Sequence, residues 1–276
     1  MEDIKSILKD TGFSFKKALG QNFITDTSFL NSMVECATLS KSDTAVEIGC
    51  GAGTLTRAIA ERAGKVYGFE VDKSLKPVLE RSLAEFENVE IIFKDFLKIN
   101  LEEFEKEVGE YQVIANLPYY VTTPLIMRLI EDAKCCKGLL IMVQEEVAER
   151  LCAKAGTPEY GAITAAVGLK ASCKIVKRAP RTLFFPKPNV DSAVVKFDFG
   201  NPLEVKSEET YKKVVRAAFS SRRKTLENNL VNALSLTRDE AKRAIASCGF
   251  SPMIRGESLS PDDFKNLSDY LYQNSL

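Results

Sequence analysis

Residues 44–72, TAVEIGCGAGTLTRAIAERAGKVYGFEVD, hold the pattern that decides the fold. A short apolar stretch leads into a run of three glycines at alternating positions, then a segment with apolar residues at helical spacing, and then a second apolar stretch. Short apolar runs bounded by glycine are typical of buried strands, and the segment between them is typical of an amphipathic helix. The stretch therefore predicts a strand–helix–strand unit of a parallel sheet.

The same alternation continues along the chain. Further strands are expected in VEIIFKDF (89–96), YQVIANLPYY (111–120), GLLIMVQ (138–144), CKIVKRA (173–179) and SAVVKFDF (192–199). After residue 204 the pattern changes, and 211–234, 237–249 and 260–273 are all predicted to be helical. We expect an α/β, doubly wound, parallel-sheet domain over 1–204 and a small helical domain over 205–276.

The composition excludes several kinds of chemistry. The 276 residues include no histidine, so Ser-His-Asp and Cys-His catalysis are ruled out and the commonest zinc ligand is missing. The 7 cysteines, an odd number without regular spacing, indicate reduced thiols and no metal site. The charged start and the absence of a long apolar run predict a cytoplasmic protein that does not cross a membrane.

Charge is unevenly distributed although the formal net charge is +0. Residues 161–190 carry 6 lysines and arginines and no acidic residue, whereas 100–110 are acidic. A basic run is most often a solvated surface, but this one contains two phenylalanines and is followed by the basic stretch SSRRKTLENNL (220–230). Aromatic residues among basic ones favour a nucleic-acid partner.

Four residues that suit ligand binding fall at the predicted ends of successive strands, namely Gly49, Glu70, Asp95 and Asn116. Because ligands of an open parallel sheet bind beyond the carboxyl ends of its strands, these residues are expected to line one crevice. Missing side chains in the glycine run let a ligand approach the backbone. A carboxylate at Glu70 is spaced to accept hydrogen bonds from both hydroxyls of a ribose.

The glycine spacing separates two kinds of nucleotide ligand. A dinucleotide fingerprint has glycine or alanine at its sixth position, where this chain has Thr54. The run matches G-x-G-x-G instead, which favours a mononucleoside ligand without a pyrophosphate. Asp95 can then accept from an adenine amino group, and Phe96 can lie against the ring. A nicotinamide oxidoreductase is disfavoured on the same grounds.

Six motifs along nearly the whole chain resemble the bacterial ribosomal RNA adenine dimethyltransferases, the family associated with kasugamycin sensitivity. They are KKALGQNFI (16–24), EIGCGAGTLT (47–56), KDFL (94–97), NLPYYVTTPLI (116–126), FFPKPNVDSAVV (184–195) and FSSRRKTLENNL (219–230). The resemblance implies a Rossmann-like, S-adenosylmethionine-dependent methyltransferase fold, with no metal. It also implies methylation of N6 of two adjacent adenines in a hairpin near the 3′ end of small-subunit ribosomal RNA, on an immature 30S subunit, by a monomeric enzyme.

The resemblance also implies a set of site residues. The methyl donor is expected to contact Asn22, Ile24, Gly49, Glu70, Asp95 and Asn116, with Gln21 and Gly51 beside them in the cofactor site and Phe96 against the adenine ring. The substrate adenine is expected to donate its amine hydrogens to the Asn116 side chain and to the backbone carbonyl of Leu117 or Pro118. Tyr119 and, by resemblance, Phe184 are expected to stack on its two faces. The helical domain is expected to bind phosphates through Arg222, Arg223 and Lys224.

Two other functions remain open at this level. The protein can be chiefly a binding factor for ribosome assembly, since such a factor needs the same fold and basic surfaces. It can also be a relative that methylates large-subunit ribosomal RNA, although NLPY and TTPLI favour the small-subunit enzymes.

Overall fold

The computed structural model describes residues 4–16, 21–118 and 121–275. Its strands are β1 (Phe23–Ile24), β2 (Thr44–Ile48), β3 (Lys65–Phe69), β4 (Val89–Ile92), β5 (Tyr111–Asn116), β6 (Cys136–Gln144), β7 (Ser172–Ala179), β8 (Phe184–Phe185) and β9 (Ser192–Asp198). Its α-helices are α1 (Ile4–Asp10), α2 (Thr27–Glu35), α3 (Thr54–Ala60), α4 (Lys76–Ser82), α5 (Leu101–Val108), α6 (Thr122–Glu131), α7 (Glu145–Leu151), α8 (Ala162–Val167), α9 (Glu208–Ala218), α10 (Leu226–Leu234), α11 (Arg238–Ser247) and α12 (Pro261–Gln273). Short 3-10 helices are η2 (Lys73–Leu75), η3 (Phe96–Lys98), η4 (Arg181–Leu183) and η5 (Gly256–Ser258).

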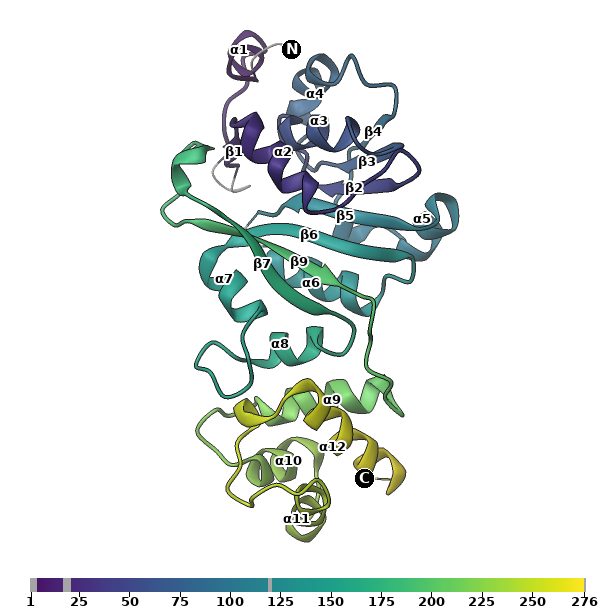
Figure 1. Ribbon diagram of the computed structural model, residues 1–276, viewed down its shortest axis with the longest axis vertical. Helices are drawn as coiled ribbons and strands as arrows, with labels where there is room; N and C mark the ends of the chain where they lie inside the picture. The colour runs from purple at the N-terminus through teal and green to yellow at the C-terminus, as the bar shows by residue number, and fades with distance from the viewer. Residues whose placement is uncertain (1–3, 17–20, 119–120, 276) are drawn as a thin grey trace. The chain divides into compact units, whose positions relative to one another are not determined.

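One sheet dominates the first part of the chain. Its order within the described residues is β4-β3-β2-β5-β6-β9-β7, as Figure 1 shows. The pairs β2–β3, β3–β4, β2–β5 and β5–β6 are parallel. Strand order reverses between β2 and β5, which is the switch point where such sheets bind ligands. The α/β fold predicted from the alternating pattern is confirmed.

The sheet is not wholly parallel, which corrects one expectation. Strand β9 runs antiparallel to β6, in a register that places Ser192 opposite Gln144. Strand β9 therefore begins where β6 ends, at the carboxyl edge of the parallel strands. A short apolar run shows burial but not direction, so the sequence pattern did not distinguish this strand.

Two strands outside the main sheet lie at this same edge. In β1 and β8, which pair antiparallel, Phe23 lies opposite Phe185 and Ile24 opposite Phe184. The segment just before β9 is thus tied to the N-terminal part of the chain.

Local sequence explains where the helices begin. Asp26 accepts a hydrogen bond from the Phe29 backbone N–H and starts α2, and Asn100 accepts from Glu103 N and starts α5. Pro77 lies in the first turn of α4, where its missing N–H costs nothing. The helix expected over 211–234 is interrupted, because 219–225 form a turn between α9 and α10.

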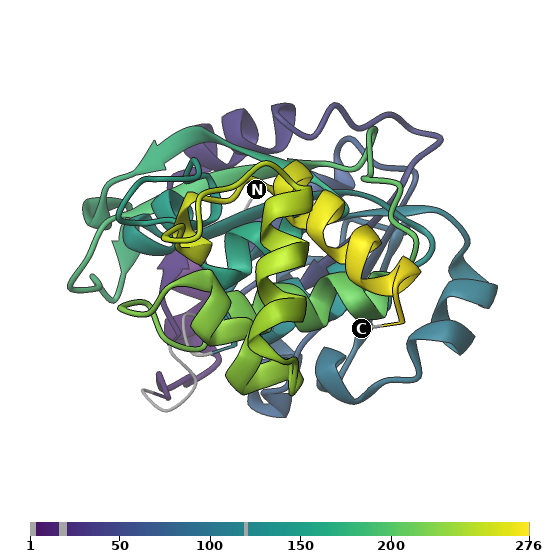
Figure 2. The same cartoon turned by 90° about the horizontal axis from the view of Figure 1, so that it is seen from below.

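The chain forms two compact units, residues 1–148 with 173–198 and residues 149–172 with 199–276. This division differs from the expected boundary at 204, since 149–172 belong with the C-terminal helices. The reason is packing: Tyr160 and Leu169 are buried in the same core as Tyr211 and Phe264. The Tyr211 hydroxyl also donates to the Ala165 carbonyl at 2.8 Å. The green-to-yellow helices of this unit appear together in Figure 2.

Among the helices of the described residues, none has the length and apolar character needed to cross a membrane.

Candidate active site

A cavity lies at the carboxyl edge of the parallel strands, within the first unit. It is lined by Gln21, Asn22, Phe23, Ile24, Leu30, Glu47, Ile48, Gly49, Cys50, Gly51, Thr54, Leu55, Phe69, Glu70, Val71, Lys94, Asp95, Phe96, Leu97, Asn116, Leu117, Pro118, Val121, Leu125 and Phe184. Every residue expected to contact the methyl donor is in this set. Leu117, Pro118 and Phe184, which are expected to meet the adenine, also line the cavity. Tyr119, expected to stack on the adenine, lies outside the described residues.

The glycine run after β2 makes a turn that only glycine fits. Gly51 has φ of +54°, and a Cβ built on it would come within 2.8 Å of the Phe23 ring. Gly53 has φ of +84°, and its Cβ would lie 2.7 Å from the Ser82 hydroxyl. Side chains at either position would be strained and would push into the neighbouring segments. The turn therefore keeps backbone exposed along the cavity wall.

Glu70, which follows β3, is held by three backbone N–H groups. One carboxylate oxygen, Oε2, accepts from Gly51 N at 2.9 Å, and the other, Oε1, accepts from Val71 N at 2.9 Å and Asp72 N at 2.8 Å. The side chain is buried, and this burial raises the pKa of Glu70, while the three N–H groups lower it and the nearby Asp72 raises it further. The carboxylate is fixed in place before any ligand arrives.

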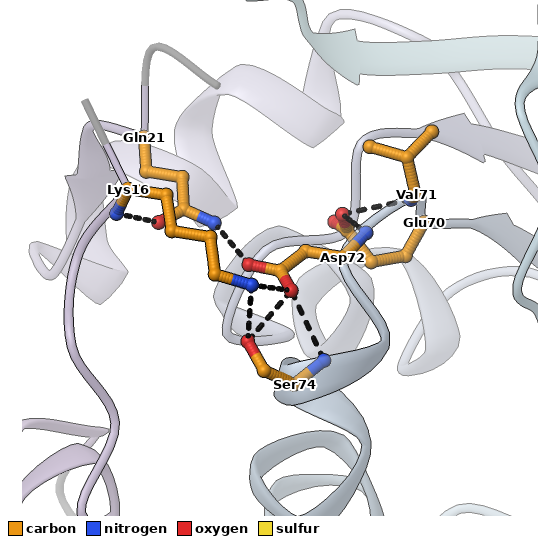
Figure 3. A network of polar contacts seen from close by, with 6 residues as sticks. All are labelled: Lys16, Gln21, Glu70, Val71, Asp72 and Ser74. Carbon is orange, nitrogen blue, oxygen red and sulfur yellow. Dashed lines mark hydrogen bonds and ion pairs between the residues drawn. The ribbon is translucent and has the colours of Figure 1, made fainter. Parts of the chain in front are cut away.

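A second network lies beside Glu70 and joins the N-terminal segment to η2 (Figure 3). Asp72 accepts hydrogen bonds from Lys16 Nζ at 2.6 Å and from Gln21 Nε2 at 2.9 Å, and the Lys16 backbone N–H donates to Gln21 Oε1 at 2.8 Å. Burial raises the pKa of Asp72, but the hydrogen bonds from Lys16, Ser74 and Gln21 outweigh it and lower that pKa to about 2. Asp72 is therefore ionised at neutral pH.

The loop after β4 presents Asp95 and Phe96. Asp95 Oδ1 accepts from the Leu97 backbone N–H at 3.0 Å and so starts η3. The Phe96 ring is buried and packs edge-on against Phe69, with centroids 5.0 Å apart. Arg128 of α6 donates to the carbonyls of Leu97 and Ile99 and thereby holds this loop in place.

The motif Asn116–Pro118 lies where β5 ends. Asn116 Nδ2 donates to the Asn22 carbonyl at 3.3 Å, so the amide has its donor side toward the N-terminal segment. The Pro118 carbonyl accepts from both Val121 N at 3.1 Å and Thr122 Oγ1 at 3.2 Å. A carbonyl oxygen has two lone pairs, and both of these are engaged in starting α6.

Phe184 reaches the cavity through strand pairing. It lies opposite Ile24 in the β1–β8 pair and is 5% exposed. The antiparallel direction of β9 carries the preceding segment, with Phe184, to the carboxyl edge and so to the cavity wall.

Glu47 was not singled out from the sequence, yet it lines the cavity. Its side chain is 1% exposed, and Oε2 has no hydrogen-bond partner among the described residues. Burial raises the pKa of Glu47 to about 8, the charge of Glu70 adds to this, and Thr56 and Cys50 lower it. A lone acidic residue inside an apolar strand that is buried on both faces was the available signal.

The three basic residues expected to bind phosphate lie in the turn between α9 and α10, not on a helix. Arg222, Arg223 and Lys224 are exposed. Arg222 Nη2 donates to the carbonyls of Tyr160 at 2.8 Å and Pro158 at 3.2 Å, so its guanidinium also stabilises the second unit.

The basic run of 161–190 is partly neutralised by ion pairs. Lys170 pairs with Glu208, Arg178 with Glu145, and Arg181 with Asp191. The run is therefore a weaker positive surface than its composition indicates. As for metals, no cluster of three or more candidate ligands occurs in the part of the chain that the structure describes.

The fold and the cavity define a class. A mostly parallel sheet with a glycine turn after its first long strand, an acidic residue after the next, and an Asn-Leu-Pro motif at the switch point is the arrangement of a Rossmann-like methyltransferase. Residues 12–271 match the family model described as ribosomal RNA adenine dimethylase, and the chain belongs to this family.

Individual relatives agree with the family. The ribosomal RNA small subunit methyltransferase A of Geobacillus thermodenitrificans is 46% identical over 97% of this chain and 94% of that protein. A solved dimethyladenosine transferase from Plasmodium falciparum has a TM-score of 0.79 at 25% identity, covering 92% of this chain and 98% of that one. The solved 23S rRNA methyltransferase ErmE has a TM-score of 0.71, also at 25% identity, covering 91% and 100%. The family and the methyltransferase fold predicted from the six motifs are confirmed.

Proposed function

We propose that this chain transfers methyl groups from S-adenosylmethionine to N6 of two adjacent adenines, in a hairpin near the 3′ end of small-subunit ribosomal RNA. The products are N6,N6-dimethyladenosines, formed on an immature 30S subunit in the cytoplasm by a monomer. The observation that carries the proposal is a single cavity that joins the Glu70 and Asp95 side to the Asn116 and Phe184 side. Family membership and the similarity to a small-subunit enzyme support the substrate.

The cavity residues fit the methyl donor. Glu70 Oε1 already accepts two N–H groups and Oε2 accepts one, so Oε2 keeps a lone pair for a ribose hydroxyl, and Asp95 can accept from the adenine amine. Glu47 Oε2, which has no hydrogen-bond partner among the described residues, offers a further polar group at the same wall. When bound, S-adenosylmethionine supplies an electrophilic methyl group on a positively charged sulfur, which is a good leaving group.

The Asn-Leu-Pro motif then orients the substrate amine. An adenine N6 is a poor nucleophile because its lone pair is delocalised into the ring. Asn116 Oδ1 and one backbone carbonyl accept its two N–H bonds, which leaves the lone pair directed at the methyl group. The carbonyl of Leu117 is the better candidate, because the Pro118 carbonyl already accepts two hydrogen bonds. Positioning replaces a strong base, in keeping with a chain that has no histidine.

Aromatic rings hold the flipped base. Phe184 lines the cavity, and Tyr119 follows the motif in sequence. Stacking on a ring contributes about 1–3 kcal/mol per base, which offsets the unstacking of the adenine from the RNA.

The second unit docks the RNA in this proposal. Arg223 and Lys224 are exposed, and Arg222 keeps part of its guanidinium for the fold. Replacing all three with alanine is expected to weaken binding to immature subunits. The slope of affinity against salt should fall by about 0.7–0.9 for each phosphate that the variant no longer neutralises. Affinity for S-adenosylmethionine should not change, and an unaltered salt slope would contradict the docking role.

An in vitro assay distinguishes the proposal from the two alternatives. Immature small subunits and naked large-subunit RNA are each incubated with the protein and S-adenosylmethionine, and methyl incorporation is measured. Incorporation into the small subunits alone is expected, whereas incorporation only into large-subunit RNA would favour the other branch of the family. If subunit maturation proceeds at full rate without the methyl donor, the protein is chiefly an assembly factor.

A further inference from the structure

Gln21 lines the cavity, but both ends of its side-chain amide are bound within the protein. Oε1 accepts from the Lys16 backbone N–H at 2.8 Å, and Nε2 donates to Asp72 Oδ2 at 2.9 Å. Figure 3 shows the amide between these two partners, with Asp72 between Gln21 and Glu70. These bonds use one lone pair of the amide oxygen and one N–H of the amide nitrogen, and they fix Gln21 against Lys16 and Asp72.

Asp72 receives its hydrogen bonds on two separate oxygens. Oδ1 accepts from Lys16 Nζ at 2.6 Å, from Ser74 N at 3.0 Å and from Ser74 Oγ at 2.6 Å. Oδ2 accepts from Gln21 Nε2. The Asp72 side chain is 2% exposed, so its charge is stabilised by these donors and not by bulk water.

The same residue is joined to the donor site through its backbone. Asp72 N donates to Glu70 Oε1 at 2.8 Å. Lys16, Gln21 and Asp72 therefore form a closed ring that holds the N-terminal segment, and the ring is fixed to the carboxylate proposed to bind the ribose. Asn22 follows Gln21 directly, and its backbone carbonyl accepts a hydrogen bond from Asn116 Nδ2. The ring thus sets the position of both halves of the cavity.

We propose that Gln21 and Asp72 are positioning residues for the methyl-donor site, and that Gln21 acts through its hydrogen bond to Asp72 and not by contacting the donor. This inference rests on the proposed donor site. It assigns the Lys16–Gln21–Asp72 ring a role in donor affinity, and it gives a specific role to Gln21, which the family resemblance put beside the contacting residues.

An exchange of donor and acceptor tests the inference. Gln21→Glu places a carboxylate against the Asp72 carboxylate and removes the N–H between them. Affinity for S-adenosylmethionine, measured by calorimetry, should fall by about 10- to 100-fold, the loss of one hydrogen bond to a charged group. Adding Asp72→Asn should restore it, because the new amide keeps its oxygen toward Lys16 and Ser74 and turns its N–H toward the new carboxylate.

The opposite outcome has a distinct signature. If Gln21 acted only by a direct contact with the donor, affinity lost in Gln21→Glu would not return on adding Asp72→Asn. Retained affinity in that variant, or no recovery in the double variant, overturns the inference. Failure of the wild-type protein to bind S-adenosylmethionine would instead overturn the proposed function. Thermal melts of all variants show whether the fold is intact.

A second variant covers the case in which Gln21→Glu does not fold. Lys16→Met removes the ion pair from a half-exposed side chain, and affinity for S-adenosylmethionine should fall by up to about fivefold. Lys137→Met is the matched control. The Lys137 side chain is 55% exposed, its Nζ lies 2.8 Å from Glu110 Oε1, and neither residue lines the cavity. Equal affinities in these two variants would contradict the role of the ring.

Discussion

The two compact units satisfy their buried polar groups differently. In the second unit, Thr237 starts α11 and Ser260 starts α12 with complete capping boxes, in which side chain and backbone bond reciprocally. Among the described residues this unit has one buried side-chain polar atom without a partner, the Tyr160 hydroxyl. The first unit has three, on Glu47, Thr56 and Arg128, and Glu47 lines the cavity.

The buried acid without a partner for Oε2 therefore lies at the cavity and not in the helical core. Natural proteins follow local rules in most of their structure and break them where function requires it. The helical unit follows the rules of capping and apolar packing. The glycine turn and the unpaired carboxyl of Glu47 break them at the cavity. Substitutions in the two units should therefore change different quantities.

The largest expected effect is in the helical core. Phe264 is 0% exposed and packs against Tyr211 and Phe219. Phe264→Ala should lower the free energy of unfolding of the second unit by about 3–5 kcal/mol. Urea denaturation measures this loss, and affinity for S-adenosylmethionine should stay unchanged. Tyr272→Ala, on the same helix but 53% exposed, is the control and should change stability by less than about 0.5 kcal/mol.

An effect of opposite sign is expected for Glu47→Gln. Because folding raises the pKa of Glu47 from 4.5 to about 8, the folded protein keeps a proton that the unfolded chain releases. Wild-type stability should therefore fall as pH rises from about 4.5 to about 8, by on the order of 1 kcal/mol per pH unit. The variant should lack this fall and be the more stable protein at pH 8.

Unfolding free energies at several pH values check this prediction. Glu102→Gln replaces an exposed carboxyl and should leave the wild-type curve in place. Parallel curves for wild type and Glu47→Gln would contradict the assignment of Glu47 as a buried, strained acid of the binding unit.

The smallest effect is expected for the cap of α11 in the second unit. Thr237→Ala removes the cap of α11 and should cost about 1 kcal/mol of stability. Glu240→Gln, which can keep the capping box, should cost less. Methyl transfer at saturating substrate should be equal for both variants and wild type, and a reduced rate in Thr237→Ala alone would show that the second unit affects the chemistry.

Much of the fold and the cavity could be predicted from the sequence. Strands β2 to β5 and the helices between them follow from local apolar period, and the four residues at the strand ends follow from one topological rule. The rule is that ligands bind beyond the carboxyl ends of parallel strands, and the structure has Gly49, Glu70, Asp95 and Asn116 in one cavity there. Phe184 required the family resemblance, since no local pattern places a residue so distant in sequence beside Ile24.

The features that could not be predicted depend on tertiary contacts. The direction of β9 depends on where the chain re-enters the sheet, and the assignment of 149–172 to the second unit depends on which core Tyr160 enters. The Lys16–Asp72 ion pair joins residues 56 positions apart, and no local pattern pairs them. The turn at 219–225 interrupts a stretch whose apolar period continues on both sides.

The central claim is that Asn116 at this cavity orients an adenine N6 of small-subunit RNA for methylation. Purified protein, S-adenosylmethionine and immature small subunits are incubated, and the RNA is digested and read by mass spectrometry. Wild type should yield N6,N6-dimethyladenosine at two adjacent positions near the 3′ end, and Asn116→Ala should be slower by about 100-fold or more with its fold retained. Dimethylation by Asn116→Ala at the wild-type rate, or wild-type methylation at other atoms or positions only, would contradict the account.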